Sequence, residues 1–534
     1  MAKPRFERLK WMGFCTVSGV LWFLAAADFD IWPLAWVAMV PAMFALERAS
    51  TRKRAVLFGW WTGFVANAGG FYWITTLLQR FGKLPLGVAI LGFLVLCAYQ
   101  AVGFALFAWL TRRIREKTSL PMALVAPVVM VTFELTVWMM LPWYLAITQA
   151  WQTVVIQVAD LTGPLGVTAL LMMVNGAIYD VATMRRKRLV TAAVSAAVLA
   201  ATLLYGVVRM GQMDALRATA PRIKVGIVQG NIGFNAKGYE NPELGRRQLA
   251  DLQRLSAELE AEGADLVVWA ESSFPYGIPR GTKSDAQLNV PVRSTREAGG
   301  LVPQFNVPLI FGAITYEPKG GKYPWNSAIM QEPDGRFTAT FDKTYLMLFS
   351  ETIPFVEELP VLRKWLPRMA GNYTRGTTLT TFDLTTRDGR KYRLGPMVCL
   401  EDIVTQFARK LAPLHPHLLV NITNDAWFGD TSEPWEHMAL SVFRSVEHRT
   451  EMVRAVNTGV SALIDLNGRV AAKTYAVDPL VTPRPADKIL VEPAMVAGGY
   501  TFYARFGDVF GWLCAATTAF LWLILPRLRG SRPR

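Results

Sequence analysis

Gly395-Pro-Met-Val-Cys399-Leu-Glu401-Asp402 is a short apolar run that ends in a thiol followed by two acids. The apolar residues predict a buried strand, with Cys399 at the point where the strand ends. A lone strand cysteine is more often a small core residue than a nucleophile, because free Cys is among the most buried residue types. The role of Cys399 therefore depends on what the rest of the chain supplies.

The 534 residues separate by composition into three parts. The chain is strongly apolar up to about residue 210 and again near its end, whereas the middle has the charge and turn content of a soluble domain. Eight apolar stretches approach the roughly 20 residues that a helix needs to cross a bilayer. These stretches are 11–28, 31–46, 56–77, 85–110, 120–141, 163–183, 188–209 and 507–526. We predict a polytopic α-helical membrane domain over residues 1–210, a soluble domain over 221–495 and a last span over 507–526.

Clusters of Lys and Arg support this count, since they lie before the first span and after the second, fourth, sixth and eighth. By the positive-inside rule, both termini are expected in the cytoplasm and the soluble domain on the opposite side. A cleaved signal peptide is the alternative for the first span, because Ala25-Ala26-Ala27 resembles a cleavage site. Since the basic clusters lie between apolar runs, the net charge of +15 does not indicate a nucleic-acid partner. The stretch 141–161, rich in Trp and broken by Pro142, predicts an interfacial or re-entrant segment.

The soluble domain alternates apolar strand patterns with helices and hairpins. Predicted strands cover 222–229, 265–270, 307–315, 337–341, 392–399 and 417–423, with Asp-Gly turns at 334–335 and 388–389. Helices are predicted over 242–262, in part over 285–298, and over 403–411 and 434–453. This alternation predicts an α/β sandwich with a mixed sheet.

The four cysteines show no paired spacing, so neither a disulfide framework nor a zinc ribbon is indicated. His415 and His417 lack acid or Cys partners at ligand spacing, so we predict no metal. His437 and His448 fall on a predicted helix, which does not favour a Cys–His pair. No internal repeat or low-complexity tract is present.

Two further polar residues follow buried strand patterns, as Cys399 does. Glu271 ends the run 265–270, and Lys343 follows the run 337–341. Taken alone, Glu271 is as well explained as an exposed acid at a turn, and Lys343 is better explained as a solvated residue. Together they would suit nucleophilic catalysis, since an ammonium favours the thiolate, a carboxylate moves protons, and the ammonium stabilises an oxyanion.

The segments Trp269-Ala-Glu271, Asp342-Lys343 and Met397-Val-Cys399 resemble the Glu–Lys–Cys signature of the nitrilase, or carbon-nitrogen hydrolase, superfamily. The stretch Asn424-Asp-Ala-Trp427-Phe428-Gly429, with flanking spans, is similar to bacterial apolipoprotein N-acyltransferases, as is Leu141-Pro142-Trp143. The resemblance implies an αββα sandwich inserted into a bacterial inner-membrane protein.

The resemblance also implies a reaction and its residues. Cys399 would take an acyl chain from a phospholipid such as phosphatidylethanolamine, and the amine of a diacylglyceryl-cysteine lipoprotein would resolve the thioester. Glu271 would be the general base and Lys343 the oxyanion partner. The remaining implied residues are the supporting acids Glu351 and Glu401 and the substrate-pocket residues Asn424, Trp427, Phe428 and Trp143. No cofactor and a monomeric chain are expected.

The chain departs from the family pattern at the expected substrate entrance. Leu400 stands where the family has Tyr, Leu348 and Ser350 replace Pro and Gly, and Gly238 lies near an expected Trp. Loops 277–285 and 346–375 are candidate lids on length and Gly/Pro content. Two alternatives stay open: a membrane-tethered amidase or nitrilase-type hydrolase in which water resolves the thioester, and a non-catalytic scaffold or transporter.

Overall fold

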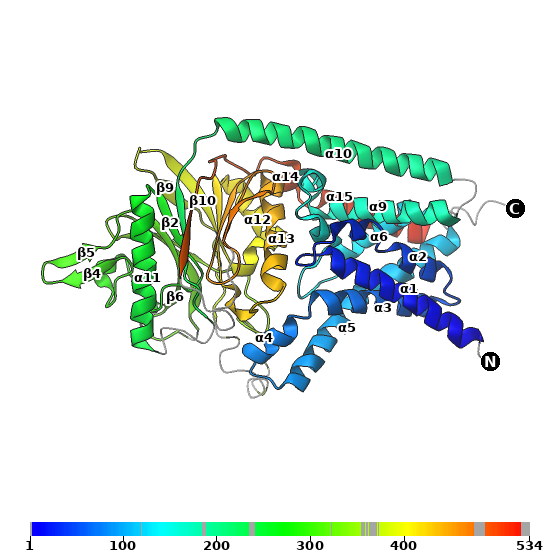
Figure 1. Cartoon of the computed structure of the whole chain (residues 1–534), viewed down its shortest axis with the longest axis horizontal. Helices are drawn as coiled ribbons and strands as arrows, with labels where there is room; N and C mark the ends of the chain where they lie inside the picture. Colours follow the sequence, from blue (N-terminus) through cyan, green and yellow to red (C-terminus); the bar gives the residue numbers. More distant parts are fainter. Residues whose placement is uncertain are drawn as a thin grey trace. The chain divides into compact units, whose positions relative to one another are not determined.

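The computed structural model describes residues 3–118, 120–183, 188–233, 241–321, 323–353, 358, 361, 371, 373–474 and 486–524. The chain forms two compact units (Figure 1). A helical unit comprises Met1–Gln79, Leu84–Gln212 and Phe506–Arg534, and a mixed α/β unit comprises Arg80–Lys83 and Met213–Arg505.

The first unit is built from helices of very different length. They are α1 (Lys3–Ala25), η1 (Trp32–Trp36), α2 (Val40–Glu47), α3 (Arg52–Gly70), α4 (Ile74–Arg80), α5 (Leu86–Lys117), α6 (Met122–Thr136), η2 (Leu145–Gln149), α7 (Thr153–Ile156), α8 (Ala159–Thr162), α9 (Pro164–Thr183), α10 (Arg188–Thr219), α15 (Val509–Ala519) and η8 (Phe520–Ile524). Among the described residues, α5, α9 and α10 are long and apolar enough to cross a membrane. Shorter apolar helices cover 32–47, 122–136, 153–162 and 509–524, so the count of eight spans stays a prediction.

The second unit alternates strands with helices. Its elements are β1 (Val225–Gln229), α11 (Pro242–Ala261), β2 (Leu266–Trp269), β3 (Ile278–Pro279), η3 (Asp285–Gln287), β4 (Ser294–Glu297), β5 (Gly300–Pro303), β6 (Leu309–Tyr316), β7 (Trp325–Gln331), β8 (Phe337–Asp342), β9 (Phe382–Thr385), β10 (Lys391–Val398), η5 (Cys399–Asp402), α12 (Thr405–Leu411), η6 (Ala412–Leu414), β11 (Leu418–Thr423), η7 (Asp425–Trp427), α13 (Glu433–His448), β12 (Met452–Val456), β13 (Ala462–Ile464), β14 (Val470–Lys473), β15 (Asp487–Val491) and α14 (Phe502–Phe506).

Two mixed sheets form the centre of this unit. One has the strand order β15-β1-β2-β6-β7-β8, with β3 paired to β6, and the other has the order β14-β13-β12-β11-β10-β9. Figure 1 shows α11 covering one sheet and α12 and α13 covering the other. The predicted sandwich with its mixed sheets is therefore confirmed as an αββα arrangement.

Local sequence explains how α11 begins and how it packs. The Asn241 side chain accepts hydrogen bonds from the backbone N–H groups of Glu243 and Leu244, and Pro242 occupies the first turn, where its missing N–H is not needed. Leucines of the helix pack on the sheet in a core that includes Trp269 at the end of β2. The Trp269 indole donates to the Ser256 hydroxyl on α11 over 2.8 Å, which fixes the strand end next to Glu271.

Two predicted helices differ from the structure. The segment 285–298 is helical only at η3, and Ser294–Glu297 is strand β4, paired with β5. The helix predicted over 434–453 ends at His448, because Arg449 adopts a left-handed conformation with φ 51° and the chain turns into β12. The apolar residues after the turn continue the pattern of the helix, so periodicity alone did not locate the end.

Candidate active site

Three strand ends bring the predicted residues to one cavity. Glu271 follows β2, Lys343 follows β8, and Cys399 follows β10 and begins η5. All three line a cavity of about 360 Å³. Their exposed fractions are 6%, 1% and 9%, so none is a solvated turn residue.

The backbone at two of these strand ends adopts a conformation that L-residues rarely take. Cys399 has φ 54° and Ser272, next to Glu271, has φ 51°. Such conformations cost about 1–3 kcal/mol each and gather at functional sites. Gly312 on β6 packs against the backbone of Ser272, because a Cβ at position 312 would come within 2.5 Å of the Ser272 nitrogen. A glycine is therefore required where β6 approaches the backbone that carries Glu271.

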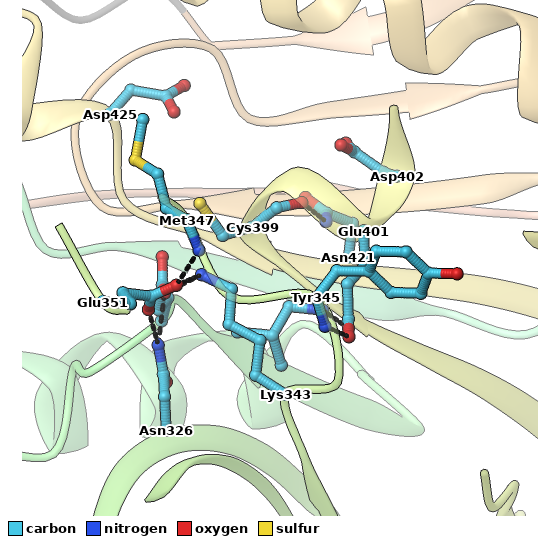
Figure 2. A network of polar contacts seen from close by, with 12 residues as sticks. Asn326, Lys343, Tyr345, Met347, Glu351, Cys399, Glu401, Asp402, Asn421 and Asp425 are labelled. Carbon is cyan, nitrogen blue, oxygen red and sulfur yellow. Dashed lines mark hydrogen bonds and ion pairs between the residues drawn. The ribbon is translucent and has the colours of Figure 1, made fainter. Parts of the chain in front are cut away.

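A compact set of polar contacts surrounds the Lys343 ammonium (Figure 2). Its Nζ lies 2.8 Å from Glu351 Oε2 and 3.5 Å from Glu271 Oε1. The Asn326 side-chain amide donates to Glu271 Oε1 over 2.6 Å and to Glu351 Oε1 over 3.2 Å. We call Glu271, Asn326, Lys343 and Glu351 the cavity cluster. Within the described part of the chain, Glu271 Oε2 has no hydrogen-bond partner, so this oxygen is available to a reacting group.

Burial and mutual charge determine the protonation of these groups. Burial raises the pKa of Cys399 well above its ordinary value; Glu271 adds to this effect and Lys343 opposes it. Burial also raises the pKa of Glu271, whereas the nearby Lys343 ammonium lowers it. For Lys343, burial favours the neutral amine, but Cys399, Glu351 and Glu271 outweigh it and raise its pKa. The resting site therefore holds a protonated thiol beside an ammonium, and attack by sulfur requires a base.

Glu401 connects the Cys399 turn to the segment after Lys343. Its Oε1 accepts from the Thr344 backbone N–H at 2.6 Å, the Thr344 hydroxyl at 2.8 Å and the Tyr345 N–H at 3.1 Å. Its Oε2 accepts from the Val398 N–H at 2.8 Å. Full burial raises the pKa of Glu401 to about 7, although these four hydrogen bonds act in the opposite direction. The carboxyl group thus holds two of the three strand ends together.

Most of the predicted pocket residues line the same cavity. Asn424, Trp427 and Phe428 all do so, and the Trp427 ring packs edge-on against Phe81 at 4.9 Å between centroids. Trp143 instead belongs to the helical unit, where its ring lies 5.2 Å from that of Phe71.

The departures from the family pattern that fall on described residues lie at or near this site. Leu400 is half-buried in η5, and Ser350 lines the cavity. Leu348 forms a bridge with Thr352. Gly238 lies outside the described residues, and the candidate lid 346–375 is described only in part.

Sequence reasoning assigned no role in the site to Asn326 or Asn421. Asn326 pairs with Ile314 across β6 and β7, and its backbone carbonyl accepts from the Lys343 N–H at 2.8 Å. Asn421, in the middle of a buried apolar strand, donates from its side chain to the Cys399 carbonyl over 3.1 Å. An amide within an apolar strand pattern is the sequence signal in both cases, but it does not reveal which groups the amide contacts.

Two protein families match different parts of the chain. Residues 224–477 match the carbon-nitrogen hydrolase family, and residues 18–177 match the apolipoprotein N-acyltransferase N-terminal domain. An amidase from Nesterenkonia sp. of known structure is 16% identical with a TM-score of 0.35, covering 53% of this chain and 92% of that chain.

Full-length relatives refine the assignment. The apolipoprotein N-acyltransferase of Geobacter metallireducens is 32% identical, covering 97% of this chain and 95% of that protein. The apolipoprotein N-acyltransferase of Bdellovibrio bacteriovorus is 29% identical, covering 86% and 84%. The chain belongs to the apolipoprotein N-acyltransferase family.

Proposed function

We propose that this protein transfers an acyl chain from a phospholipid, through a thioester on Cys399, to the N-terminal amine of a diacylglyceryl-cysteine lipoprotein. The observation that carries this proposal is the meeting of Glu271, Lys343 and Cys399 at one cavity in a chain of this family. Phosphatidylethanolamine is the proposed donor class, and no cofactor or metal takes part.

The first half-reaction forms the thioester. Cys399 Sγ attacks the ester carbonyl carbon of the donor while Glu271 takes the thiol proton. The tetrahedral oxyanion is stabilised by the Lys343 ammonium and by a backbone N–H that follows Cys399. When the C–O bond breaks, Glu271 returns the proton to the leaving lysophospholipid oxygen.

The second half-reaction uses the same groups in reverse. The acceptor amine attacks the thioester carbonyl, Glu271 takes a proton from the nitrogen, and Lys343 again faces the oxyanion. Breakage of the C–S bond releases the amide product, and the proton returns to Cys399. Glu351 supports the position of Lys343, and Glu401 supports the strand ends that carry Lys343 and Cys399.

We further propose that the chain crosses the bacterial inner membrane eight times as a monomer, with both termini in the cytoplasm and the α/β unit in the periplasm. The clusters of Lys and Arg lie before the first predicted span and after the second, fourth, sixth and eighth, and this pattern supports the topology. Both proposed substrates carry acyl chains, so a site reached from the outer leaflet of the bilayer suits them.

The acyl-enzyme is the decisive species to test. Purified protein is incubated with labelled phosphatidylethanolamine in detergent, and the intact mass is measured. We expect one acyl adduct on Cys399, released by hydroxylamine and discharged by a diacylated lipopeptide. Cys514→Ala in the helical unit is the matched control and should keep the adduct.

Two outcomes would contradict the proposal. A hydroxylamine-sensitive adduct that still accumulates on Cys399→Ala would remove Cys399 from its role. Discharge by water as fast as by the lipopeptide would instead support the hydrolase alternative.

A further inference from the structure

A second buried polar group of residues lies next to the Cys399 turn. Its members are Asp402, Asp425, Glu433, His437 and Arg454, which we call the ion network. Their exposed fractions are between 0% and 5%, and none of the five is among the described residues that line the cavity. They come from η5, η7, α13 and β12, so the network joins elements that are distant in the sequence.

His437 is the centre of this network. Its Nε2 lies 2.9 Å from Asp402 Oδ1, and its Nδ1 lies 3.1 Å from Asp425 Oδ1. An ionised carboxylate can only accept a hydrogen bond, so a ring that donates to two of them carries a hydrogen on each nitrogen. Burial favours the neutral ring, but Asp402 and Asp425 outweigh burial and the opposing Arg454, and the pKa of His437 rises to about 10.

The two carboxylates belong to the two turns that form the candidate site. Asp402 ends the η5 turn that begins at Cys399, and Asp425 begins the η7 turn, whose Trp427 lines the cavity. Figure 2 shows Asp402 and Asp425 on separate chain segments beside the Cys399 turn. The His437 ring therefore bridges the turn that carries Cys399 and the turn that forms part of the cavity wall.

Arg454 holds the same turn from the neighbouring strand. Its Nε lies 3.2 Å from Asp402 Oδ2, and in the sheet Arg454 is paired with Asn421, whose side chain contacts the Cys399 carbonyl. Asp402 thus has two basic side chains beside it: the His437 ring, in hydrogen-bond contact, and the Arg454 guanidinium, at ion-pair distance. Cys399 keeps its left-handed φ of 54° only if the surrounding contacts hold it there.

We propose that His437, in its doubly protonated form, is a positioning residue that holds the Cys399 turn against the Asp425 turn. The proposal rests on the proposed function, because it assigns His437 to the step in which Cys399 becomes acylated. The imidazolium also offsets the charge of Asp425, which by itself raises the pKa of Cys399. Loss of His437 should therefore slow attack by sulfur without removing the binding cavity.

A bound divalent cation is the competing account of this cluster. Ligand atoms of Asp425, Glu433 and His437 lie within 4.8 Å of one another, and Asp425 Oδ2 and Glu433 Oε2 have no hydrogen-bond partner among the described residues. A cation there would require Nδ1 of His437 without its hydrogen. Burial and Asp425 raise the pKa of Glu433 well above its ordinary value, and elemental analysis of the protein distinguishes a bound cation from a protonated cluster.

The protonation state of His437 is measured directly on the wild-type protein. The chain has four histidines, so ¹⁵N spectra of histidine-labelled protein are assigned by single substitutions. At pH 8 we expect both His437 nitrogens to carry hydrogen, whereas His448 is neutral, because burial and the nearby arginines lower the pKa of His448 to about 3. A neutral His437 at pH 8, or one equivalent of tightly bound metal by elemental analysis, would overturn the proposal.

The effect on chemistry is measured with matched variants. His437→Gln removes the charge, and His448→Gln is the control on the same helix, equally buried and, among the described residues, without a ring hydrogen bond. We expect His437→Gln to slow single-turnover acylation of Cys399 by about 30–100-fold with KM for the phospholipid nearly unchanged, in line with a misplaced nucleophile. His448→Gln should stay within about threefold of wild type.

A double substitution separates positioning from general damage to the fold. We expect the single variant Asp402→Asn and the double variant Asp402→Asn/His437→Gln to show about the same acylation rate of Cys399. Each of them removes the contact between Asp402 and His437. An acylation rate of His437→Gln close to that of His448→Gln would overturn the proposal. If wild-type protein forms no acyl adduct at all, the proposed function fails, whereas the spectra of His437 still decide the protonation state.

Discussion

The cavity cluster and the ion network are made of the same kinds of residue and are equally buried, yet they differ in access. Each holds carboxylates around a buried cation, Lys343 in one and His437 with Arg454 in the other. The cavity cluster lines a space of about 360 Å³, whereas no residue of the ion network is among the described residues that line it. In the ion network, the carboxylates and the cations are packed against one another. Burying charged groups costs free energy in both sets. The cavity cluster is the one available for reaction, because its residues face the cavity.

Removing the buried cation from each cluster should give the largest contrast. Lys343→Met leaves Glu271 and Glu351 without their shared ammonium and removes the oxyanion partner. We expect acylation of Cys399 to fall by about 10³–10⁴-fold, as loss of an oxyanion donor and a charge partner together implies. The rate is measured by quenched-flow formation of the acyl adduct.

Arg454→Met is the matched variant in the ion network. It should lower the melting temperature more than Lys343→Met does and slow acylation by only about tenfold, because His437 still holds Asp402. Equal rate losses in the two variants would mean that the clusters are not functionally distinct.

The second effect concerns the proton that leaves Cys399. Glu271→Gln keeps the shape of the side chain but cannot accept a proton, so we expect acylation to slow by about 10²–10³-fold. The loss should be smaller at high pH, where hydroxide can substitute for the missing base. A pH-independent loss would assign Glu271 to structure and not to proton transfer.

The sequence predicted the strand ends of the cavity cluster better than it predicted their contacts. Glu271, Lys343 and Cys399 each follow an apolar strand pattern, and the resemblance to the Glu–Lys–Cys signature was needed to group them as one site. Asn326 could not be found in this way, since its role depends on pairing between β6 and β7 and on which face of the sheet it occupies. His437 was predicted to lie on a helix, and nothing local to it reveals that Asp402 faces it.

The third effect tests the amide that orients both acids. Asn326→Ala removes hydrogen bonds to Glu271 Oε1 and Glu351 Oε1 and leaves those oxygens buried. We expect about a tenfold loss of acylation rate and a melting temperature lowered by a few degrees, in line with about 1–3 kcal/mol for buried acceptors left unsatisfied. Both are measured on detergent-purified protein. Thr295→Ala on β4 is the control and should change neither.

The smallest effect is on stability and follows from the buried carboxyl of Glu401. Its pKa in the folded protein is about 7, above the ordinary value of 4.5, so the folded state favours the protonated form. The contribution of Glu401 to the unfolding free energy is therefore greatest below about pH 4.5 and decreases as the pH rises through 7. The difference between the two values corresponds to about 3 kcal/mol at most.

Glu401→Gln isolates this contribution because an amide does not titrate in this range. The variant loses a hydrogen bond at every pH, since its NH₂ group faces backbone N–H donors. We expect its melting temperature to lie well below that of the wild type at pH 5 and the gap to narrow by pH 8, as the wild type loses the proton on Glu401. Glu297→Gln, at an exposed position on β4, should show no such change in the gap. A gap that widens with pH would mean that the four hydrogen bonds outweigh burial and hold Glu401 as a carboxylate throughout.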